Sequence, residues 1–431
     1  MRPTVGENRE TSNVDVTLVL THDCNLGCSY CYTGAKFSKR MTPETAAKAV
    51  ELAFSGGARE TQLSFFGGEP LLAYEQLVRS ATEARARASA SGVGLKMSVT
   101  TNGTLLDAAR ARELDALGVY VALSIDGTRE AHESGRPLMG GGSSFEQVAR
   151  GLDVLVQRAV PFETISVVTP QNAHLVGETV EFLFAAGVPR VGLNPCYEAA
   201  FTDEELAGWE RGLERAADVM IDWYRKGRIV SVTVFDNKIL AAIKGGLAEG
   251  DKCSLGQTSV AVAPSGNLFP CERLVAEDES PEYLMGHLDD WKPSVEDNCA
   301  RGPVNAECEP CGERWRCGSF CACSNRAETG RTDLAGGTQC WHERTTARIA
   351  DRIAETLWEE RNEPFIAWFY GRMAGAAPSP GAAEPTQEAT MEDAKQPAKE
   401  EAHVAPRGQA NAIPRAPRAP VTSRKRLVVV T

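Results

Sequence analysis

Residues 21–33 read THDCNLGCSYCYT, which places Cys24, Cys28 and Cys31 in the spacing C-x3-C-x2-C with an aromatic residue directly after the last cysteine. The stretch follows an apolar, β-branched run that is typical of a buried strand. Three thiolates this close together can ligate three irons of a [4Fe–4S] cluster, and the fourth iron is then left without a protein ligand. Such an opening suits a site that binds and reduces a substrate, whereas a structural zinc site would close it. Zinc stays the alternative, with His22 as the only nearby fourth ligand.

The chain around this loop alternates between short β-branched runs and longer amphipathic segments, from Val14 to about Arg225. The expected strands are Val14–Leu20, Thr61–Phe66, Leu95–Thr101, Val119–Ile125, Glu163–Val168 and Val191–Asn194. The expected helices are Pro43–Phe54, Leu71–Ser91, Leu106–Leu117, Phe145–Ala159, Ala173–Ala186 and Asp203–Arg225. Six β/α repeats predict an α/β fold with a parallel sheet and right-handed crossovers. An open doubly wound sheet and a partial barrel both fit, and both place ligands at the carboxyl ends of the strands.

Further motifs fall at those strand ends. The second strand is followed by Gly67-Gly68-Glu69-Pro70, in which the glycines let the backbone approach another group closely and Glu69 can accept a hydrogen bond from an ammonium group. The third strand ends in TTNGT (100–104) and the fourth in LSIDG (123–127), which contain Asn102, Ser124 and Asp126. Asn102 is also a plausible turn residue, because it precedes a glycine.

Together the cysteine loop and the Gly-Gly-Glu-Pro turn resemble the signatures of the radical S-adenosylmethionine (SAM) superfamily. The resemblance implies a partial (β/α)6 TIM-like barrel in which the open iron chelates the amino and carboxylate groups of SAM. Reduction then cleaves SAM to a 5′-deoxyadenosyl radical, which abstracts a substrate hydrogen.

The same resemblance implies roles for the strand-end motifs. Gly67, Gly68, Glu69 and Pro70 would bind the SAM amino group. Asn102, Ser124 and Asp126 would meet its ribose and carboxylate, and Tyr32 would contact the adenine unless it is a plain core aromatic. The stretch His132 to Phe145 also resembles the peptide-modifying members. Arg136 within it can pair with a carboxylate, but we interpret it as a solvated arginine.

The chain has thirteen cysteines, and of the ten outside the first loop all but Cys196 lie from Cys253 onward. Such numbers point to metal or redox chemistry in a reducing compartment. The first two form C-x12-G-x4-C with Gly266, and the rest of the pattern is C-x2-C-x5-C-x3-C followed by one more cysteine: Cys253, Cys271, Cys308, Cys311, Cys317, Cys321 and Cys340. This pattern resembles the SPASM domain, which holds two auxiliary iron–sulfur clusters, and the resemblance implies [4Fe–4S] cores for both. A zinc ribbon on the middle four cysteines would leave the others unexplained.

By the family's pattern one auxiliary cluster would have four ligands, which are Cys308, Cys311, Cys317 and Cys340. The other would have Cys253, Cys271 and Cys321. Some members supply a further cysteine six residues after the first of this group, where this chain has Ser259. That cluster therefore has an exposed iron, a non-cysteine ligand or a smaller core, and Cys323 is a second candidate ligand. Cys196 and Cys299 are interpreted as buried or incidental thiols.

The remaining composition sets the domain limits. We expect an N-terminal tail (1–13), a radical SAM partial barrel (14–234), a small Cys-rich auxiliary iron–sulfur domain (235–345), a C-terminal helix (346–372) and a disordered tail (373–431). The N-terminus lacks a secretory signal and no apolar run reaches about twenty residues, so a cytoplasmic protein without a membrane span is expected. A net charge of −12 argues against nucleic-acid binding.

Within the family, two auxiliary clusters usually accompany modification of a peptide or protein side chain. We therefore expect a maturase of a ribosomally made peptide that forms a thioether or carbon–carbon cross-link. Its partners would be the peptide, a reductant such as flavodoxin or ferredoxin, and a separate leader-peptide-binding protein. A formylglycine-generating enzyme of the sulfatase-maturing type is the alternative. In those members an Asp follows the cysteine of G-x4-C, whereas Cys271 is followed here by Glu272, our candidate catalytic base. An iron–sulfur electron carrier without radical chemistry is a third possibility.

Overall fold

Seven strands that follow one another along the chain lie side by side in the same order, β1-β2-β3-β4-β5-β6-β7, and every neighbouring pair is parallel. The strands are β1 (Asp15–Val19), β2 (Glu60–Phe66), β3 (Gly94–Thr101), β4 (Val119–Ser124), β5 (Phe162–Val168), β6 (Arg190–Pro195) and β7 (Ser231–Val232). A doubly wound sheet would reverse its strand order at one point. The sequential order is that of a partial barrel, as the resemblance implied.

This computed structural model describes residues 15–55, 59–248, 251–253, 255–256, 259–278, 281–290 and 306–373. The two predicted tails lie outside these residues except for Met373, and so does Cys299. None of the helices in the described ranges is long and apolar enough to cross a lipid bilayer.

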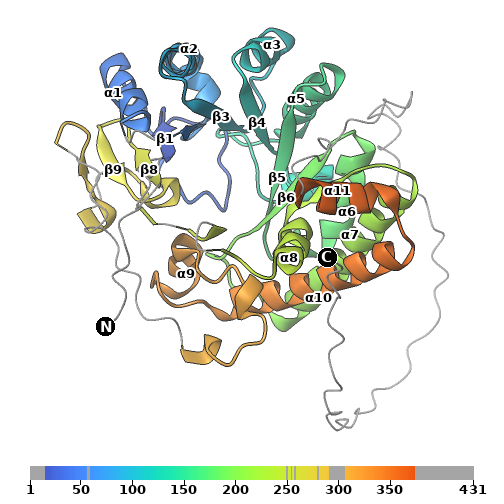
Figure 1. Cartoon of the computed structure of the whole chain (residues 1–431). Coiled ribbons are helices and arrows are strands. Elements are labelled where there is room, and N and C mark those ends of the chain that lie inside the picture. Colours follow the sequence, from blue (N-terminus) through green and yellow to red (C-terminus); the bar gives the residue numbers. More distant parts are fainter. Residues whose placement is uncertain are drawn as a thin grey trace, which may run out of the picture. The chain divides into compact units, whose positions relative to one another are not determined.

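The crossover helices cover the outer face of the curved sheet (Figure 1). They are α1 (Pro43–Ala53), α2 (Tyr74–Ser91), α3 (Ala108–Ala116), α5 (Phe145–Gln157), α6 (Val176–Ala185) and α7 (Asp203–Arg225), with the short α4 (Arg129–Glu133) before α5. Two of these helices begin at residues whose side chains cap the first turn. Thr42 and Thr202 cap α1 and α7 in this way, and Thr202 forms a capping box with Glu205. The six predicted strands and six predicted helices are thus confirmed in position.

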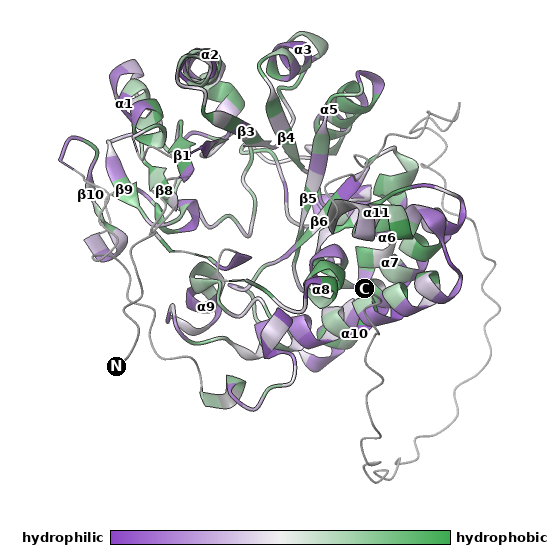
Figure 2. Cartoon of the chain, in the orientation of Figure 1, coloured by the Kyte–Doolittle hydropathy of each residue, from purple (hydrophilic) through white to green (hydrophobic). Residues whose placement is uncertain are grey.

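Each strand presents alternate residues to the core. In β5 every second residue is buried, and in β2 the buried residues are Thr61, Leu63 and Phe65. Figure 2 shows the apolar strands facing apolar sides of the helices, whereas the polar sides of α1, α2 and α3 face outward. The barrel core therefore lies between sheet and helices, and the loops at the strand ends are left for other contacts.

The sheet continues beyond the barrel strands. Strand β8 (Ser259–Val262) pairs in parallel with β1, and β9 (Asn267–Phe269) and β10 (Gly286–His287) extend it by antiparallel pairing. Strands from the second cysteine region thus lie beside the strand that leads into the first cysteine loop. Helix α8 (Thr233–Lys244) spans the expected domain boundary at residue 234, and that boundary stays a prediction.

The C-terminal part of the described chain is helical. Helix α9 (Ala322–Thr329) precedes α10 (Gly337–Glu359), which packs along α7 and α8. The segment expected as one terminal helix differs, because a second helix, α11 (Glu363–Met373), begins after a break. Arg361 takes a left-handed conformation with φ 51°, and the Asn362 side chain accepts a hydrogen bond from the Phe365 amide, as a helix cap does.

Candidate functional site

A cavity of about 320 Å³ opens at the carboxyl ends of the barrel strands. The thiol-bearing residues Cys24, Cys28 and Cys31 all line it. The strand-end residues in its wall come from β2 to β6 and include Phe66, Gly67, Thr100, Thr101, Ser124, Ile165, Val167, Asn194 and Pro195. The structure therefore brings the first cysteine motif and the strand-end motifs to one site.

The Gly-Gly turn holds the cysteine loop in place. The Gly68 amide donates to the Thr21 carbonyl (2.7 Å) and the Glu69 amide donates to the Asp23 carbonyl (2.9 Å). A Cβ on Gly67 would lie 2.4 Å from the Thr21 oxygen, and one on Gly68 would lie 2.2 Å from the Asp23 oxygen. Gly67 also has φ +140°, which strains any other residue. The glycines thus permit a close approach of backbone to the cysteine loop.

The three thiols differ in how readily they lose a proton. Burial raises the pKa of Cys24 to about 11 and also raises the pKa of Cys28. Burial opposes ionisation of Cys31 too, but hydrogen bonds from Thr33 and from the Lys36 ammonium (3.0 Å) lower its pKa. His22, the fourth ligand in the zinc alternative, is buried with its ring stacked on Phe37 at 4.5 Å and is not among the residues of the cavity wall.

Glu69 lies behind the cavity wall and ties two strand ends together. It is fully buried, and its carboxylate accepts hydrogen bonds from the Thr101 hydroxyl (2.7 Å) and from the amides of Asn102 (2.8 Å) and Leu71 (2.9 Å). Burial raises the pKa of Glu69. Neither Glu69 nor Pro70 is among the residues that line the cavity.

Asn102 does line the cavity and connects the third strand to the cysteine loop. Its side-chain amide donates to Asn25 (2.9 Å), and its carbonyl oxygen accepts from the Thr104 amide (3.0 Å). Asn25 in turn donates to the Thr104 hydroxyl (2.7 Å). Asn102 therefore lies both in a turn and in the cavity wall, and its contact with SAM stays a prediction.

Asp126 is buried beneath the cavity and organises its surroundings. Its carboxylate pairs with Arg136 (2.9 Å) and accepts hydrogen bonds from the Tyr30 hydroxyl (2.5 Å) and the Val167 amide (2.8 Å). Arg136 lines the cavity, is only 5% exposed and has no hydrogen-bond partner for its Nε among the described residues. The interpretation of Arg136 as a solvated arginine is therefore wrong.

The reason lies in how the segment after α4 folds back. The amides of Gly27 and Ser29 in the cysteine loop donate to the carbonyls of Pro137 (2.9 Å) and Gly135 (3.0 Å), so Arg136 is held against that loop. His132 supports the segment from below: it accepts from the Asp126 amide (3.4 Å) and contacts the Ser144 hydroxyl (2.9 Å), which donates to the Arg136 carbonyl (2.6 Å).

Residues of the second cysteine region reach the same cavity. Glu272 and Arg273, which follow Cys271, are both in the wall. The Arg273 guanidinium lies 4.5 Å from the centre of the Tyr32 ring and donates to Glu198 (2.8 Å). Tyr32 thus lies in the wall between Arg273 and the Phe66 ring, whose centroid is 6.3 Å away.

The cavity residues that the sequence interpretation did not assign to the site include Cys196, Glu198 and Arg273. Cys196 is buried, as expected, but it lies directly after β6 and its thiol contacts Glu198 at 3.7 Å. Its position after a strand end was the signal that could have identified it, since the other motifs share that position.

Three of the predicted auxiliary ligands are gathered in the structure, whereas the grouping of the other four stays a prediction. Cys253, Cys271 and Cys321 pack against a small buried cluster that contains Leu255, Leu274 and Cys323. Of the other four predicted ligands, Cys308 ends the short turn Ala306–Cys308, and Cys311 lies in the turn that follows it. Cys317 follows the turn Arg314–Arg316, and Cys340 lies in the first turn of α10.

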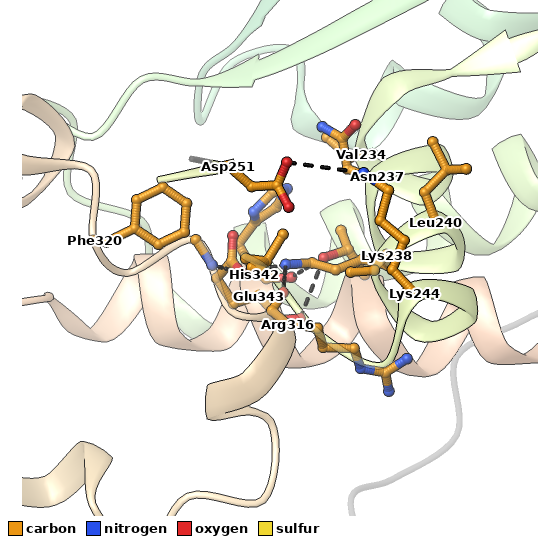
Figure 3. A pocket seen from close by; sticks show the side chains of 14 residues that line it. Val234, Asn237, Lys238, Leu240, Lys244, Asp251, Arg316, Phe320, His342 and Glu343 are labelled. Carbon is orange, nitrogen blue, oxygen red and sulfur yellow. Dashed lines mark hydrogen bonds and ion pairs between the residues drawn. The ribbon is translucent and has the colours of Figure 1, made fainter. Parts of the chain in front are cut away.

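A second cavity of about 320 Å³ lies between α8, α10 and the segment around Cys317 (Figure 3). Lys238 lines this cavity, and its ammonium donates to the Arg316 carbonyl (2.8 Å) and pairs with Glu343. Glu343 also accepts from the Gly318 amide, next to Cys317. This buried pair joins α8 to the segment that carries a predicted cluster ligand.

Comparison with known proteins agrees with the geometry. Residues 18–183 match the sequence model of the Radical SAM superfamily. A serine-type anaerobic sulfatase-maturating enzyme of Klebsiella aerogenes is 25% identical over 339 residues, which is 73% of this chain and 80% of that relative. A cysteine-type enzyme of Clostridium perfringens is 22% identical over 284 residues, 62% of this chain and 75% of its own.

Solved structures show the same fold. Native anSMEcpe with bound AdoMet superposes with a TM-score of 0.68 at 20% identity, over 80% of this chain and 98% of that one. Streptococcus suis SuiB bound to precursor peptide SuiA gives 0.52 at 15% identity, over 77% and 76%. With its barrel, its cysteine loop and these relatives, the chain contains a radical SAM domain over residues 18–183 and is similar to the anaerobic sulfatase-maturating enzymes over most of its length.

Proposed function

We propose that this radical SAM enzyme is a peptide maturase that abstracts a hydrogen atom from a peptide side chain and forms a thioether or carbon–carbon cross-link. One observation carries the proposal: a single cavity wall contains the three thiols of the first motif together with Glu272 and Arg273 from the second cysteine region. A substrate side chain in that cavity would meet both parts of the chain.

Cys24, Cys28 and Cys31 would hold the [4Fe–4S] cluster that the family uses. The donor set fits, because three thiols share one wall and the fourth cysteine in that wall, Cys196, contacts Glu198 instead. When bound, the cluster and SAM supply the 5′-deoxyadenosyl radical. The chain's own part is to bind SAM, orient it and exclude water.

The residues for SAM binding would act in two layers. Tyr32, Gly67, Gly68, Asn102 and Ser124 line the cavity and would contact the cofactor. Glu69, Pro70 and Asp126 lie outside its wall; Glu69 would act through Thr101 and Asn102, and Asp126 through Arg136. The unpartnered Nε of Arg136 would then be available to the SAM carboxylate, which a buried guanidinium binds well.

The second cysteine region would hold two auxiliary clusters. Cys308, Cys311, Cys317 and Cys340 would ligate one, and Cys253, Cys271 and Cys321 would ligate the other. The packing of the latter three around one buried cluster supports that grouping.

The reaction would balance in two one-electron steps. A substrate C–H bond breaks, and its hydrogen atom ends in 5′-deoxyadenosine. Formation of the new S–C or C–C bond would require the substrate to lose a second electron, for which an auxiliary cluster would supply the acceptor when bound, and a proton. Glu272, which lines the cavity beside Cys271, would accept that proton.

A formylglycine-generating activity is the second candidate. It is supported by the similarity to serine-type and cysteine-type anaerobic sulfatase-maturating enzymes. It needs the same base, and here Glu272 takes the place of the family's Asp. A peptide partner is supported in either case, since solved relatives hold a Cp18Cys peptide or the precursor peptide SuiA. A flavodoxin or ferredoxin reductant and a leader-binding protein stay proposals.

The test is an anaerobic reaction of the loaded enzyme with cysteine-bearing precursor peptides and with a sulfatase-type peptide. A cross-link removes two hydrogen atoms and leaves no aldehyde, whereas formylglycine reacts with a hydrazide. We expect the first product in mass spectra, and a hydrazide-reactive product alone would replace the cross-linking proposal by the second candidate.

The Glu272→Gln variant tests the base, with Glu198→Gln as a matched control from the same wall. Glu272→Gln should still form 5′-deoxyadenosine but lose about 10²-fold or more of peptide product. Equal loss in both variants would show that Glu272 has no special role.

A further inference from the structure

Four cysteines, not three, lie in or against one small buried cluster in the auxiliary region nearer the cavity, although no three metal-binding side chains of the described residues are already arranged around a common point. Cys323 belongs to the buried cluster with Leu255, Leu274 and Ala322, and it is 4% exposed. Cys253, Cys271 and Cys321 pack against that same cluster. The thiols of Cys271 and Cys323 also interact with each other, so their sulfur atoms are neighbours.

The local backbone explains how two cysteines so close in sequence face one group. Cys321 has an extended conformation as the residue before α9, whereas Cys323 lies in the first turn of that helix. Cys271 likewise has an extended backbone just before the turn Glu272–Leu274. Three separate segments of the chain, those of Cys253, Cys271 and the start of α9, therefore converge on one place.

We propose that Cys323 supplies the fourth thiolate of the auxiliary cluster held by Cys253, Cys271 and Cys321. The inference rests on the proposed function, because it presumes an auxiliary cluster there. In this chain the position six residues after Cys253 is Ser259, whose backbone forms the first pair of β8 with Asp15 of β1. The missing ligand is thus replaced from α9 instead of from β8.

Among the described residues, one further thiol outside the predicted ligand sets is a competing candidate, that of Cys196. Cys196 is also buried, but it lies in the wall of the main cavity, where it contacts Glu198. A cluster with four thiolate ligands has no open iron. It would accept the second electron of the reaction but would not bind a substrate thiolate, so the substrate must be positioned by the cavity wall alone.

The test uses the full-length chain in which Cys24, Cys28 and Cys31 are all changed to Ala, so that only auxiliary clusters remain. The chain is loaded with iron and sulfide, and its iron content and the electron paramagnetic resonance spectrum of the reduced protein are measured with and without cyanide. Cyanide is the probe because it binds an iron that lacks a protein ligand. Cys323→Ala in this background is compared with Cys196→Ala as a matched buried-thiol control.

We expect about eight irons per chain in the background protein, since two [4Fe–4S] clusters hold that number, and a spectrum that cyanide leaves unchanged. Cys323→Ala should either respond to cyanide or lose up to half of the iron, whereas Cys196→Ala should do neither. A cyanide response with Cys323 intact would overturn the inference without any variant at that position, and so would Cys323→Ala behaving like the control. About four irons or fewer in the background protein would instead overturn the two-cluster proposal itself.

Discussion

The Arg136 guanidinium lies 2.9 Å from the Asp126 carboxylate, and both side chains are buried beside the wall that carries Cys28. Burial disfavours the charge on Arg136, but Asp126 and Tyr30 raise its pKa, so the cation is retained. The pair also joins the end of β4 to the segment that holds the cysteine loop. It is therefore positioned both to stabilise the fold and to bind an anion.

These two roles can be separated by substitution. Arg136→Met leaves Asp126 buried without its cation and should lower the free energy of unfolding by about 3–5 kcal/mol. The double variant Asp126→Asn/Arg136→Met removes both charges and should regain much of that stability, measured by denaturant unfolding. SAM binding, measured by equilibrium dialysis, should stay at least tenfold weaker in the double variant. Normal SAM affinity in that variant would limit Arg136 to a structural role.

A substitution in the Gly-Gly turn should cause loss of iron from the first cluster alone. Gly68→Ala places a methyl group where the Asp23 carbonyl oxygen already lies, 2.2 Å from the Cβ position, so the cysteine loop must shift. We expect the loaded variant to lose about four irons, those of the first cluster. Gly140→Ala is the control, because nothing lies within 4 Å of its Cβ position. Full iron content and activity in Gly68→Ala would show that the loop tolerates the displacement.

We expect the buried His132 to make the free energy of unfolding depend on pH. Burial, followed by the charge of Arg136, lowers its folded pKa to about 4 from an ordinary value near 6.5. Between these values the unfolded chain binds the proton and the folded chain does not, so stability falls as the pH is lowered from 6.5 toward 4. One such group contributes a slope of up to about 1.4 kcal/mol per pH unit.

The measurement is the free energy of unfolding of wild type and His132→Gln at several pH values between 5 and 7. The variant is expected to be less stable overall, because it loses the contacts with Ser144 and Asp126, but to show a flatter slope. His342 has a similarly low pKa of about 4 owing to its burial, so some slope should remain. An unchanged slope would mean that His132 is not the titrating group.

The Lys238–Glu343 pair links α8 to the segment of Cys317, which is a predicted ligand of the auxiliary cluster with four cysteines. Their side chains are 9% and 12% exposed, and Glu343 also accepts from the amide next to Cys317. Lys238→Met should destabilise the protein by about 3 kcal/mol and reduce the iron content. Lys238→Met/Glu343→Gln should restore most of both, because the Gln oxygen can still accept from Gly318. Iron loss in the double variant equal to that in Lys238→Met would contradict this explanation.

Much of the barrel could be predicted because its signals are local. The alternation of buried residues in strands such as β5 and the caps at Thr42 and Thr202 are written in neighbouring residues. The motifs Gly67–Pro70 and 123–127 fell at strand ends for the same reason. The cysteine spacing likewise identified the two cysteine regions, because several candidate ligands recur within a few residues of one another.

The rest depended on contacts between distant segments. Arg136 was misinterpreted because its burial arises from pairing of residues 135–137 with the cysteine loop. The contact of Arg273 with Tyr32, and that of Cys323 with Cys271, join segments with no shared pattern. The break before α11 was different, since Asn362 and Pro364 are ordinary helix-start signals within the segment that was expected to form one helix.

If Cys24, Cys28 and Cys31 support SAM cleavage, the yield of 5′-deoxyadenosine depends on all three. The protein would be purified anaerobically, loaded with iron and sulfide, and given SAM and dithionite. We predict 5′-deoxyadenosine from the wild type and none from the variant in which all three cysteines are changed to Ala. No product from a wild type whose first cluster is fully loaded would contradict the account and favour an iron–sulfur electron carrier.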